Sequence, residues 1–223
     1  MTLPMPPQAV LFDLDGTLVD SAPDLVGALQ ALCAEIGAPP PDAEAVRTVV
    51  SAGGRAMLRR GLPQPDEATV ERHLPRFLAI YAERIAEATR PYAGIADFLD
   101  RLEAEGIAWG IVTNKPGWLA RPLVERLGWA GRCAALVSGD CLAAKKPDPL
   151  PVLHACGLAA AEPARTWFVG DDRRDIEAGR AAGTPTVAAA WGYLDGGDPA
   201  TWQADLVIAA PSGLSALLGR TGG

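Results

Sequence analysis

The sequence has little positive charge. Its 20 lysines and arginines face 27 aspartates and glutamates, which gives a net charge of −7 at pH 7. No long run of lysines or arginines interrupts this acidic balance. Because nucleic-acid binding generally requires a basic surface that contacts phosphates, we expect no nucleic-acid partner.

Long apolar runs and paired cysteines are missing as well. No stretch approaches the roughly 20 apolar residues that a membrane-spanning helix needs, and the start of the chain lacks the basic-then-apolar pattern of a secretory signal. The four cysteines form no CxxC pair, which argues against a zinc site or a disulfide framework. We therefore expect a soluble cytoplasmic protein with no membrane partner, whose four thiols are free and buried.

Six short apolar segments are typical of strands that are buried on both faces of a parallel sheet. They span residues 9–12, 108–113, 135–138, 166–170, 186–190 and 205–209. Helical patterns separate most of them. Alternating strands and helices predict an α/β fold with a doubly wound parallel sheet.

The first crossover breaks this alternation. Residues 21–90 contain three helical patterns and no convincing strand, and the first pattern opens with Ser21 and Asp24 at capping-box spacing. The block is too long for one crossover helix, so we expect an inserted, all-helical subdomain. The predicted division is a core of residues 1–18 and 92–223 and a helical cap of residues 19–91, with hinges near residues 18–21 and 89–94.

Carboxylates, hydroxyls and lysines follow four of the predicted strands. In a parallel sheet the carboxyl ends of the strands share one edge, where ligands bind. The residues at this edge are Asp13, Asp15, Thr17, Thr113, Asn114, Lys115, Lys145, Lys146, Asp171, Asp172 and Asp175.

This set of residues suits phosphate chemistry at a metal ion. Clustered carboxylates disfavour one another's ionisation, and without nearby histidine or cysteine they suit a hard cation, most simply Mg²⁺. The metal would attract a phosphate, which Thr113, Asn114 and Lys146 could hold. An aspartate can attack phosphorus, and a second carboxyl two residues away could protonate the leaving alkoxide and then activate water. Neither GxxxxGK[ST] nor GxGxxG occurs, so nothing supports nucleotide binding.

Four stretches, DLDGT, VTN, KKPDP and GDDRRD, resemble in this order the four motifs of the haloacid dehalogenase superfamily. The helical insert after the first stretch resembles the small C1 cap of its phosphatase branch. The resemblance spans nearly the whole chain. It implies a Rossmann-like core and phosphoryl transfer through an aspartyl-phosphate.

The resemblance also implies roles for single residues. Asp13 would be the nucleophile and a Mg²⁺ ligand, and Asp15 would be the general acid and base whose backbone carbonyl also binds the metal. The remaining implied roles are a phosphoryl contact for Thr113 and Lys146, a metal contact for Asp171, support from Asp172 and Asp175, and substrate contacts for Thr17 and Asn114. No role is assigned to Lys145.

One loop of the predicted cap is a candidate for substrate recognition. Gly53 and Gly54 permit a tight turn between helices, and Arg55 follows at once. An arginine there could meet a substrate carboxylate in a bidentate pair, although an exposed first-turn arginine without such a role fits equally well. We count Gly54 and Arg55 among the candidate substrate-binding residues.

Other stretches narrow the resemblance. VVSAGGRAML, RPYAG, WGIVTNKP and WGYLDGGDPATWQAD resemble phosphoglycolate phosphatase-like proteins, and among them a subgroup that acts on N-acetylmuramic acid 6-phosphate in cell-wall recycling. Both substrates are small phosphate esters with a carboxylate, and the resemblance implies a Mg²⁺-dependent phosphomonoester hydrolase for one of them.

Three alternatives were weighed against this hydrolase. A phosphomutase of the β-phosphoglucomutase kind shares all four motifs and stays open. A dehalogenase lacks the second aspartate of the first motif, so Asp15 argues against it. A non-enzymatic metal-binding protein should have lost a catalytic residue, and none is missing. The sequence makes no prediction of the oligomeric state.

Overall fold

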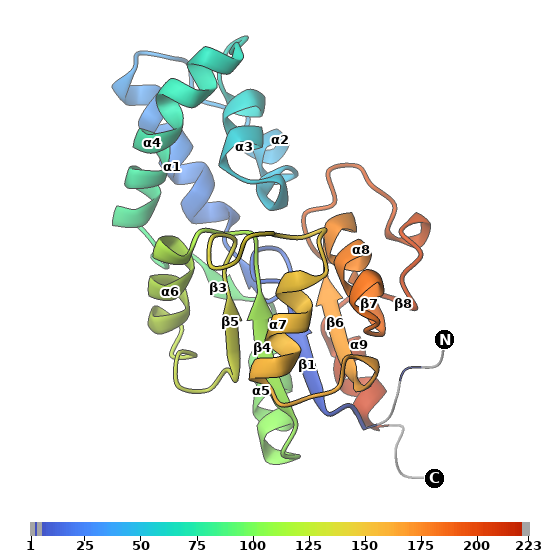
Figure 1. Cartoon of the computed structure of the whole chain (residues 1–223). Coiled ribbons are helices and arrows are strands. Elements are labelled where there is room, and N and C mark those ends of the chain that lie inside the picture. The colour runs from blue at the N-terminus through green and yellow to red at the C-terminus, as the bar shows by residue number, and fades with distance from the viewer. Residues whose placement is uncertain (1–2, 4–5, 220–223) are drawn as a thin grey trace.

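A six-stranded parallel sheet forms the centre of the computed structural model, which describes residue 3 and residues 6–219 (Figure 1). Its strands are β1 (Ala9–Phe12), β4 (Ala108–Val112), β5 (Ala135–Val137), β6 (Thr166–Gly170), β7 (Thr186–Ala189) and β8 (Leu206–Ile208), in the order β5-β4-β1-β6-β7-β8. All six predicted segments form strands, and the doubly wound α/β fold is confirmed. Because β1 lies between β4 and β6, its carboxyl end opens at the point where the strand order reverses, which is where ligands bind in such sheets.

Helices cover both faces of the sheet, which explains why its strands are apolar throughout. Val10 and Phe12 pack into one cluster with α5 (Ile95–Ala104), α6 (Gly117–Arg126) and α9 (Ser212–Leu218). Leu11 points to the opposite cluster, with α7 (Leu150–Leu158) and α8 (Arg173–Ala182). In the described part of the chain, no helix is long and apolar enough to cross a membrane.

A helical block lies beyond the carboxyl ends of the strands (Figure 1). It contains α1 (Ala22–Glu35), α2 (Ala43–Arg47), the short 3₁₀ turn η1 (Val50–Ala52), α3 (Gly54–Gly61) and α4 (Glu67–Glu83). Helix α4 packs against both α1 and α3. We call this block the cap, and its division from the core at residues 19 and 91 remains our proposal.

A two-stranded ribbon joins the cap to the core. Strand β2 (Val19–Asp20) pairs antiparallel with β3 (Arg90–Pro91). The two predicted hinge segments therefore lie side by side, although they are about 70 residues apart in the sequence.

The predicted capping box at the start of α1 is wrong. The Ser21 hydroxyl makes no capping hydrogen bond and instead donates to Asp15 at 2.5 Å. Asp24 is buried and accepts hydrogen bonds from the backbone N–H groups of Ala88 and Thr89, at 2.7 and 2.9 Å, and from the Thr89 hydroxyl at 2.6 Å. These distant donors take the carboxylate that the capping box would have used, and Asp24 thereby ties α1 to the end of the cap.

The prediction that all four cysteines are buried is also wrong in part. Cys33 and Cys156 are buried, whereas Cys133 is half-buried and Cys141 is exposed. The exposed thiol donates to the backbone carbonyl of Ser138 at 3.0 Å. All four are free thiols, as expected.

We expect Asp24→Ala to lower the free energy of unfolding by about 2–4 kcal/mol, because the buried N–H and hydroxyl of Thr89 would lose their acceptor. Asp42 is a matched control, since it accepts two backbone N–H groups at the exposed start of α2; Asp42→Ala should cost about 1 kcal/mol. Urea denaturation of both variants tests this difference. Equal losses would contradict a special role for the buried carboxylate.

Candidate active site

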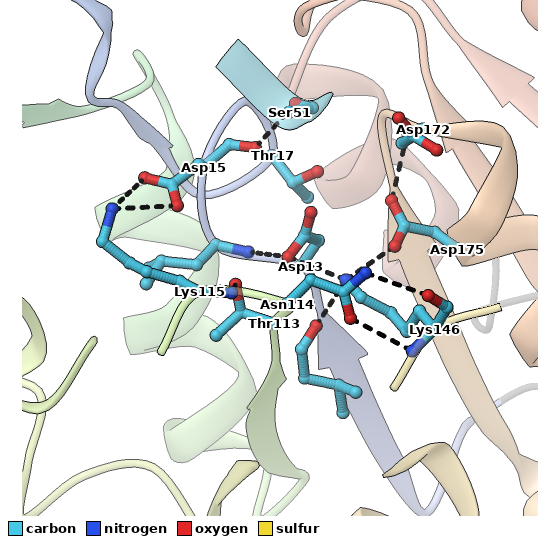
Figure 2. A network of polar contacts seen from close by, with 12 residues as sticks. Asp13, Asp15, Thr17, Ser51, Thr113, Asn114, Lys115, Lys146, Asp172 and Asp175 are labelled. Atoms are coloured by element: carbon cyan, nitrogen blue, oxygen red, sulfur yellow. Dashed lines mark hydrogen bonds and ion pairs between the residues drawn. The ribbon is translucent and has the colours of Figure 1, made fainter. Parts of the chain in front are cut away.

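A buried lysine joins two carboxylates at the end of β1 (Figure 2). The Lys146 ammonium lies 2.8 Å from Asp13 Oδ1 and 2.7 Å from Asp175 Oδ1, and it donates to the Val112 carbonyl at 2.7 Å. Burial alone would lower the pKa of Lys146, but the two carboxylates raise it above its ordinary value. Lys146 is therefore a fixed cation beside Asp13.

Asp13 has one oxygen in use and one available. Its Oδ1 accepts from the Leu14 N–H at 2.7 Å as well as from Lys146. The described residues donate no hydrogen bond to Oδ2. The carboxylate is thus held in place by one oxygen while the other is free to react.

Asp13, Asp171 and Asp175 each offer a carboxylate oxygen to a cluster in which these atoms lie within 4.8 Å of one another. Burial, and then the neighbouring carboxylates, raise the pKa of Asp171 well above its usual range. Burial also raises the pKa of Asp175 to about 7, against the opposing effect of Lys146. Among the described residues, no lysine or arginine forms an ion pair with Asp171. An all-oxygen cluster with unbalanced negative charge fits a hard divalent cation such as Mg²⁺.

Hydrogen bonds from three segments hold Asp171. Its carboxylate accepts from Thr17 Oγ1 at 2.7 Å, from the Tyr193 N–H at 2.9 Å and from Ser51 Oγ at 2.9 Å. A Cβ at Gly16 would lie 2.1 Å from Asp171 Oδ2, and this glycine has a φ of +88°. Close approach and backbone conformation both require glycine there. Thr17, predicted to touch the substrate, is fully buried, and its hydroxyl donates to Asp171.

Asp15 lies on the other side of Asp13 and belongs to a second polar group (Figure 2). Both of its carboxylate oxygens lie 3.1 Å from the Lys115 ammonium, and Oδ1 also accepts from Ser21. Its backbone carbonyl accepts from Ser51 Oγ at 3.3 Å. Lys115 was expected at this edge of the sheet, directly after Thr113 and Asn114, but the sequence assigned it no role.

Thr113 and Asn114 follow β4 and lie close to Lys146 (Figure 2). The Asn114 amide donates to the Lys146 carbonyl at 2.9 Å and accepts from the Lys146 N–H at 3.0 Å. The nitrogen and the oxygen of the Asn114 amide thus both bind the backbone of Lys146. Asn114 thereby positions this lysine. Thr113 is buried, and its hydroxyl oxygen accepts from the Lys115 N–H at 3.2 Å.

Asp172 begins α8 and forms a capping box with Asp175. Its N–H donates to Asp175 Oδ2 at 3.0 Å, and its carboxylate lies 2.6 Å from the Arg174 guanidinium. Burial raises the pKa of Asp172, but Arg174 outweighs this effect and lowers it. Arg174 also donates to the Ser51 carbonyl at 2.8 Å, so α8 touches the cap.

Ser51 of the cap donates to the Asp171 carboxylate and the Asp15 carbonyl, and no role was predicted for it from the sequence. The two predicted cap residues have other contacts. Arg55 is 55% exposed and pairs with Glu71 at 2.5 Å. A Cβ at Gly54 would lie 3.0 Å from Leu74, so this glycine allows α3 to pack on α4.

A cavity of about 340 Å³ opens between the cap and the core beside Asp171. Its lining includes Thr48 and Ala52 of the cap and Asp195, Asp198 and Trp202 of the loop after β7. Of the three clustered carboxylates, Asp171 is the one that lines this cavity.

Comparison with known proteins places the chain in a recognised family. The model of the family described as haloacid dehalogenase-like hydrolase matches residues 10–189. A phosphoglycolate phosphatase of Xanthomonas campestris is 47% identical over 206 residues, which cover 92% of this chain and 93% of that protein. An N-acetylmuramic acid 6-phosphate phosphatase of Pseudomonas aeruginosa is 46% identical over 215 residues, which cover 96% of this chain and 95% of that protein.

Solved structures share the fold. The crystal structure of a predicted phosphoglycolate phosphatase from Haemophilus somnus matches with a TM-score of 0.84 and 26% identity. The match covers 94% of this chain and 97% of that chain, so it includes both the sheet and the cap.

We expect Ser51→Ala to lower kcat/KM about 10-fold, because the cap would lose its hydrogen bonds to the Asp171 carboxylate and the Asp15 carbonyl. Amide hydrogen exchange in residues 48–54 should become faster, since these bonds hold the 3₁₀ turn against the core. Ser215→Ala, in α9, is the matched control. The role of Ser51 would be contradicted if both variants behaved alike in the two measurements.

Proposed function

Because the chain belongs to the haloacid dehalogenase-like hydrolases, we propose that it is a Mg²⁺-dependent phosphatase that cleaves a small phosphate monoester through a phosphorylated Asp13. The proposal rests on the contacts of the two carboxylate oxygens of Asp13. One oxygen is bound by Lys146 and the Leu14 N–H, and the other faces the site without a hydrogen bond from the described residues. A carboxylate held in this way is suited to attack.

In the first step, Asp13 Oδ2 attacks phosphorus and forms a P–O bond while the bond to the leaving oxygen breaks. Asp15 gives a proton to that oxygen, so the product leaves as an alcohol. Lys146, with the Thr113 hydroxyl, stabilises the charge on the phosphoryl oxygens. For this step Asp15 must be protonated and turned toward the leaving group, away from Lys115.

In the second step, the now ionised Asp15 accepts a proton from water, and the oxygen of that water attacks phosphorus. The P–O bond to Asp13 breaks, which releases inorganic phosphate and restores the carboxylate. Lys146 holds the Asp13 oxygen throughout, so the nucleophile returns to its starting geometry.

The metal would be held by Asp13 and Asp171, with the Asp15 carbonyl as a third ligand and Asp175 in support. When bound, Mg²⁺ neutralises the charge that gathers as two anions meet. Asp171 is oriented for this role by Thr17 and Tyr193, whose hydrogen bonds fix both of its oxygens.

The proposed substrate class is an ester that carries a carboxylate. It follows from the relatives, which are named for phosphoglycolate and N-acetylmuramic acid 6-phosphate. Both compounds join a carboxylate to a phosphate monoester. We further propose a cytoplasmic location, which suits four free thiols. Analysis of the products separates hydrolysis, which releases phosphate, from a phosphomutase reaction, which does not.

Asp13→Asn should reduce kcat by about 10⁴-fold or more, as removal of a covalent nucleophile does in other enzymes. The amide keeps the shape of the side chain but loses its negative charge. Steady-state assays with 2-phosphoglycolate and p-nitrophenyl phosphate measure the effect, and Asp97→Asn at an exposed helix position is the control. Turnover near that of the control would rule out the phosphorylated aspartate.

Removal of the metal should abolish activity, and added Mg²⁺ should restore it. Ca²⁺ should restore little, because it takes more ligands at longer distances than an octahedral site offers. Mg²⁺ should also raise the melting temperature of the chelated protein, since binding to the folded state stabilises it. Full activity after exhaustive chelation would exclude the metal site.

A further inference from the structure

The carboxylate of the proposed substrate needs a cation near the leaving group, and most cations of the site are already committed. Lys146 contacts Asp13, Asp175 and a backbone carbonyl. Arg174 binds Asp172 and the Ser51 carbonyl. The cavity beside Asp171 is lined by four aspartates and one arginine, so its charge disfavours a second anion.

Lys115 differs from these cations. Its side chain is only 6% exposed, and its ammonium contacts one carboxylate, that of Asp15, at 3.1 Å. The same nitrogen lies 4.5 Å from the centre of the Tyr81 ring. Asp15 is the proposed general acid, and it must leave Lys115 to face the ester oxygen. At that moment Lys115 becomes a buried cation without an anion, which is a costly state unless another anion takes the place.

Tyr81 supplies a second observation at the same point. It belongs to α4 of the cap and is fully buried, yet its hydroxyl has no well-aligned hydrogen-bond partner among the described residues. Burial raises the pKa of Tyr81 to about 12, although Lys115 opposes this, so the phenol is a neutral donor at pH 7. A buried hydroxyl without a partner costs free energy, and an incoming carboxylate oxygen would accept its hydrogen bond.

We propose that Lys115 of the core and Tyr81 of the cap together bind the carboxylate of the substrate. The inference rests on the proposed phosphatase function. A general acid must lie about 2.6–3.2 Å from the ester oxygen, and Lys115 lies next to Asp15. The carboxylate it binds must therefore be close to that oxygen. In 2-phosphoglycolate one carbon separates the ester oxygen from the carboxylate. In N-acetylmuramic acid 6-phosphate the phosphate is on the exocyclic C6 and the carboxylate belongs to the lactyl ether on C3, so the two groups lie farther apart. Lys115 and Tyr81 therefore select 2-phosphoglycolate over N-acetylmuramic acid 6-phosphate.

The experiment compares two esters of the same skeleton, 2-phosphoglycolate and 2-hydroxyethyl phosphate, of which only the first has a carboxylate. The quantity measured is the ratio of their kcat/KM values. A variant that disturbs Asp15 affects both esters, so the disturbance cancels in the ratio. Lys115→Met should lower the ratio at least about 30-fold, the cost of removing one partner of a buried charged pair. Lys145→Met, the same change at an exposed lysine without an assigned role, should leave the ratio unchanged.

Tyr81→Phe tests the hydroxyl without disturbing the packing of the ring. It should lower the ratio about 10-fold. Its melting temperature should stay close to that of the wild type, because the hydroxyl it removes has no well-aligned hydrogen bond among the described residues. Loss of selectivity without loss of stability separates a binding role from a structural one. Calorimetry with 3-phosphonopropionate, a non-hydrolysable analogue, should show weaker binding to both variants, and propylphosphonate should bind all proteins alike.

The outcomes that overturn the inference are distinct from those that overturn the proposed function. An unchanged ratio in Lys115→Met and Tyr81→Phe removes both residues from recognition. A ratio lowered only by Arg55→Ala moves the carboxylate to the cap loop. A wild-type preference for N-acetylmuramic acid 6-phosphate over 2-phosphoglycolate overturns the selection for the short ester and leaves the phosphatase intact. If the wild type with Mg²⁺ hydrolyses none of these esters, the proposed function itself fails.

Discussion

Three carboxylates share one buried place at the end of β1, and burying like charges together costs free energy. Lys146 offsets part of that cost by pairing with Asp13 and Asp175. Much of the surrounding structure serves this arrangement. Asn114 binds the backbone of Lys146, and Asp172 binds Asp175 in a capping box. Glycine at position 16 leaves room for the carboxylate of Asp171. The remaining imbalance of charge is what prepares the site for a cation.

The same constraint explains how the cap is held. The cap meets the core at polar groups that also belong to the site, since Ser51 donates to Asp171 and accepts from Arg174. On the opposite side, Tyr81 of the cap lies against Lys115 of the core. The cap therefore contacts charged groups of the site as well as the apolar cluster that runs through both parts of the molecule. In the proposed function, binding of a phosphate or a metal would change the partners of these groups, so the position of the cap and binding would be linked energetically.

The sheet and the central residues of the site could be predicted because the signals are local. A strand buried on both faces is apolar throughout. Asp13 and Asp171 follow such strands directly, and Lys146 lies in the loop after β5. The missed features depend on contacts that only the folded chain creates. Ser51 and Asp171 form a hydrogen bond although they are 120 positions apart in the sequence. Asp24 and Thr89 are 65 positions apart, and their hydrogen bonds replace the predicted capping box at the start of α1. The spacing of residues along the sequence does not indicate that Ser51 would contact Asp171 or that Asp24 would contact Thr89.

The ribbon that joins the proposed cap to the core brings the two points at which the chain crosses between them side by side. Asp20 of β2 and Arg90 of β3 are paired residues, so the chain leaves the core and re-enters it at neighbouring points. A tight hairpin turn spans such a pair. Replacing the cap with a short turn, or with a cap of another size, would not require any strand of the large sheet to move. In the proposed function, the core would keep its phosphoryl chemistry while a different cap would change the range of leaving groups.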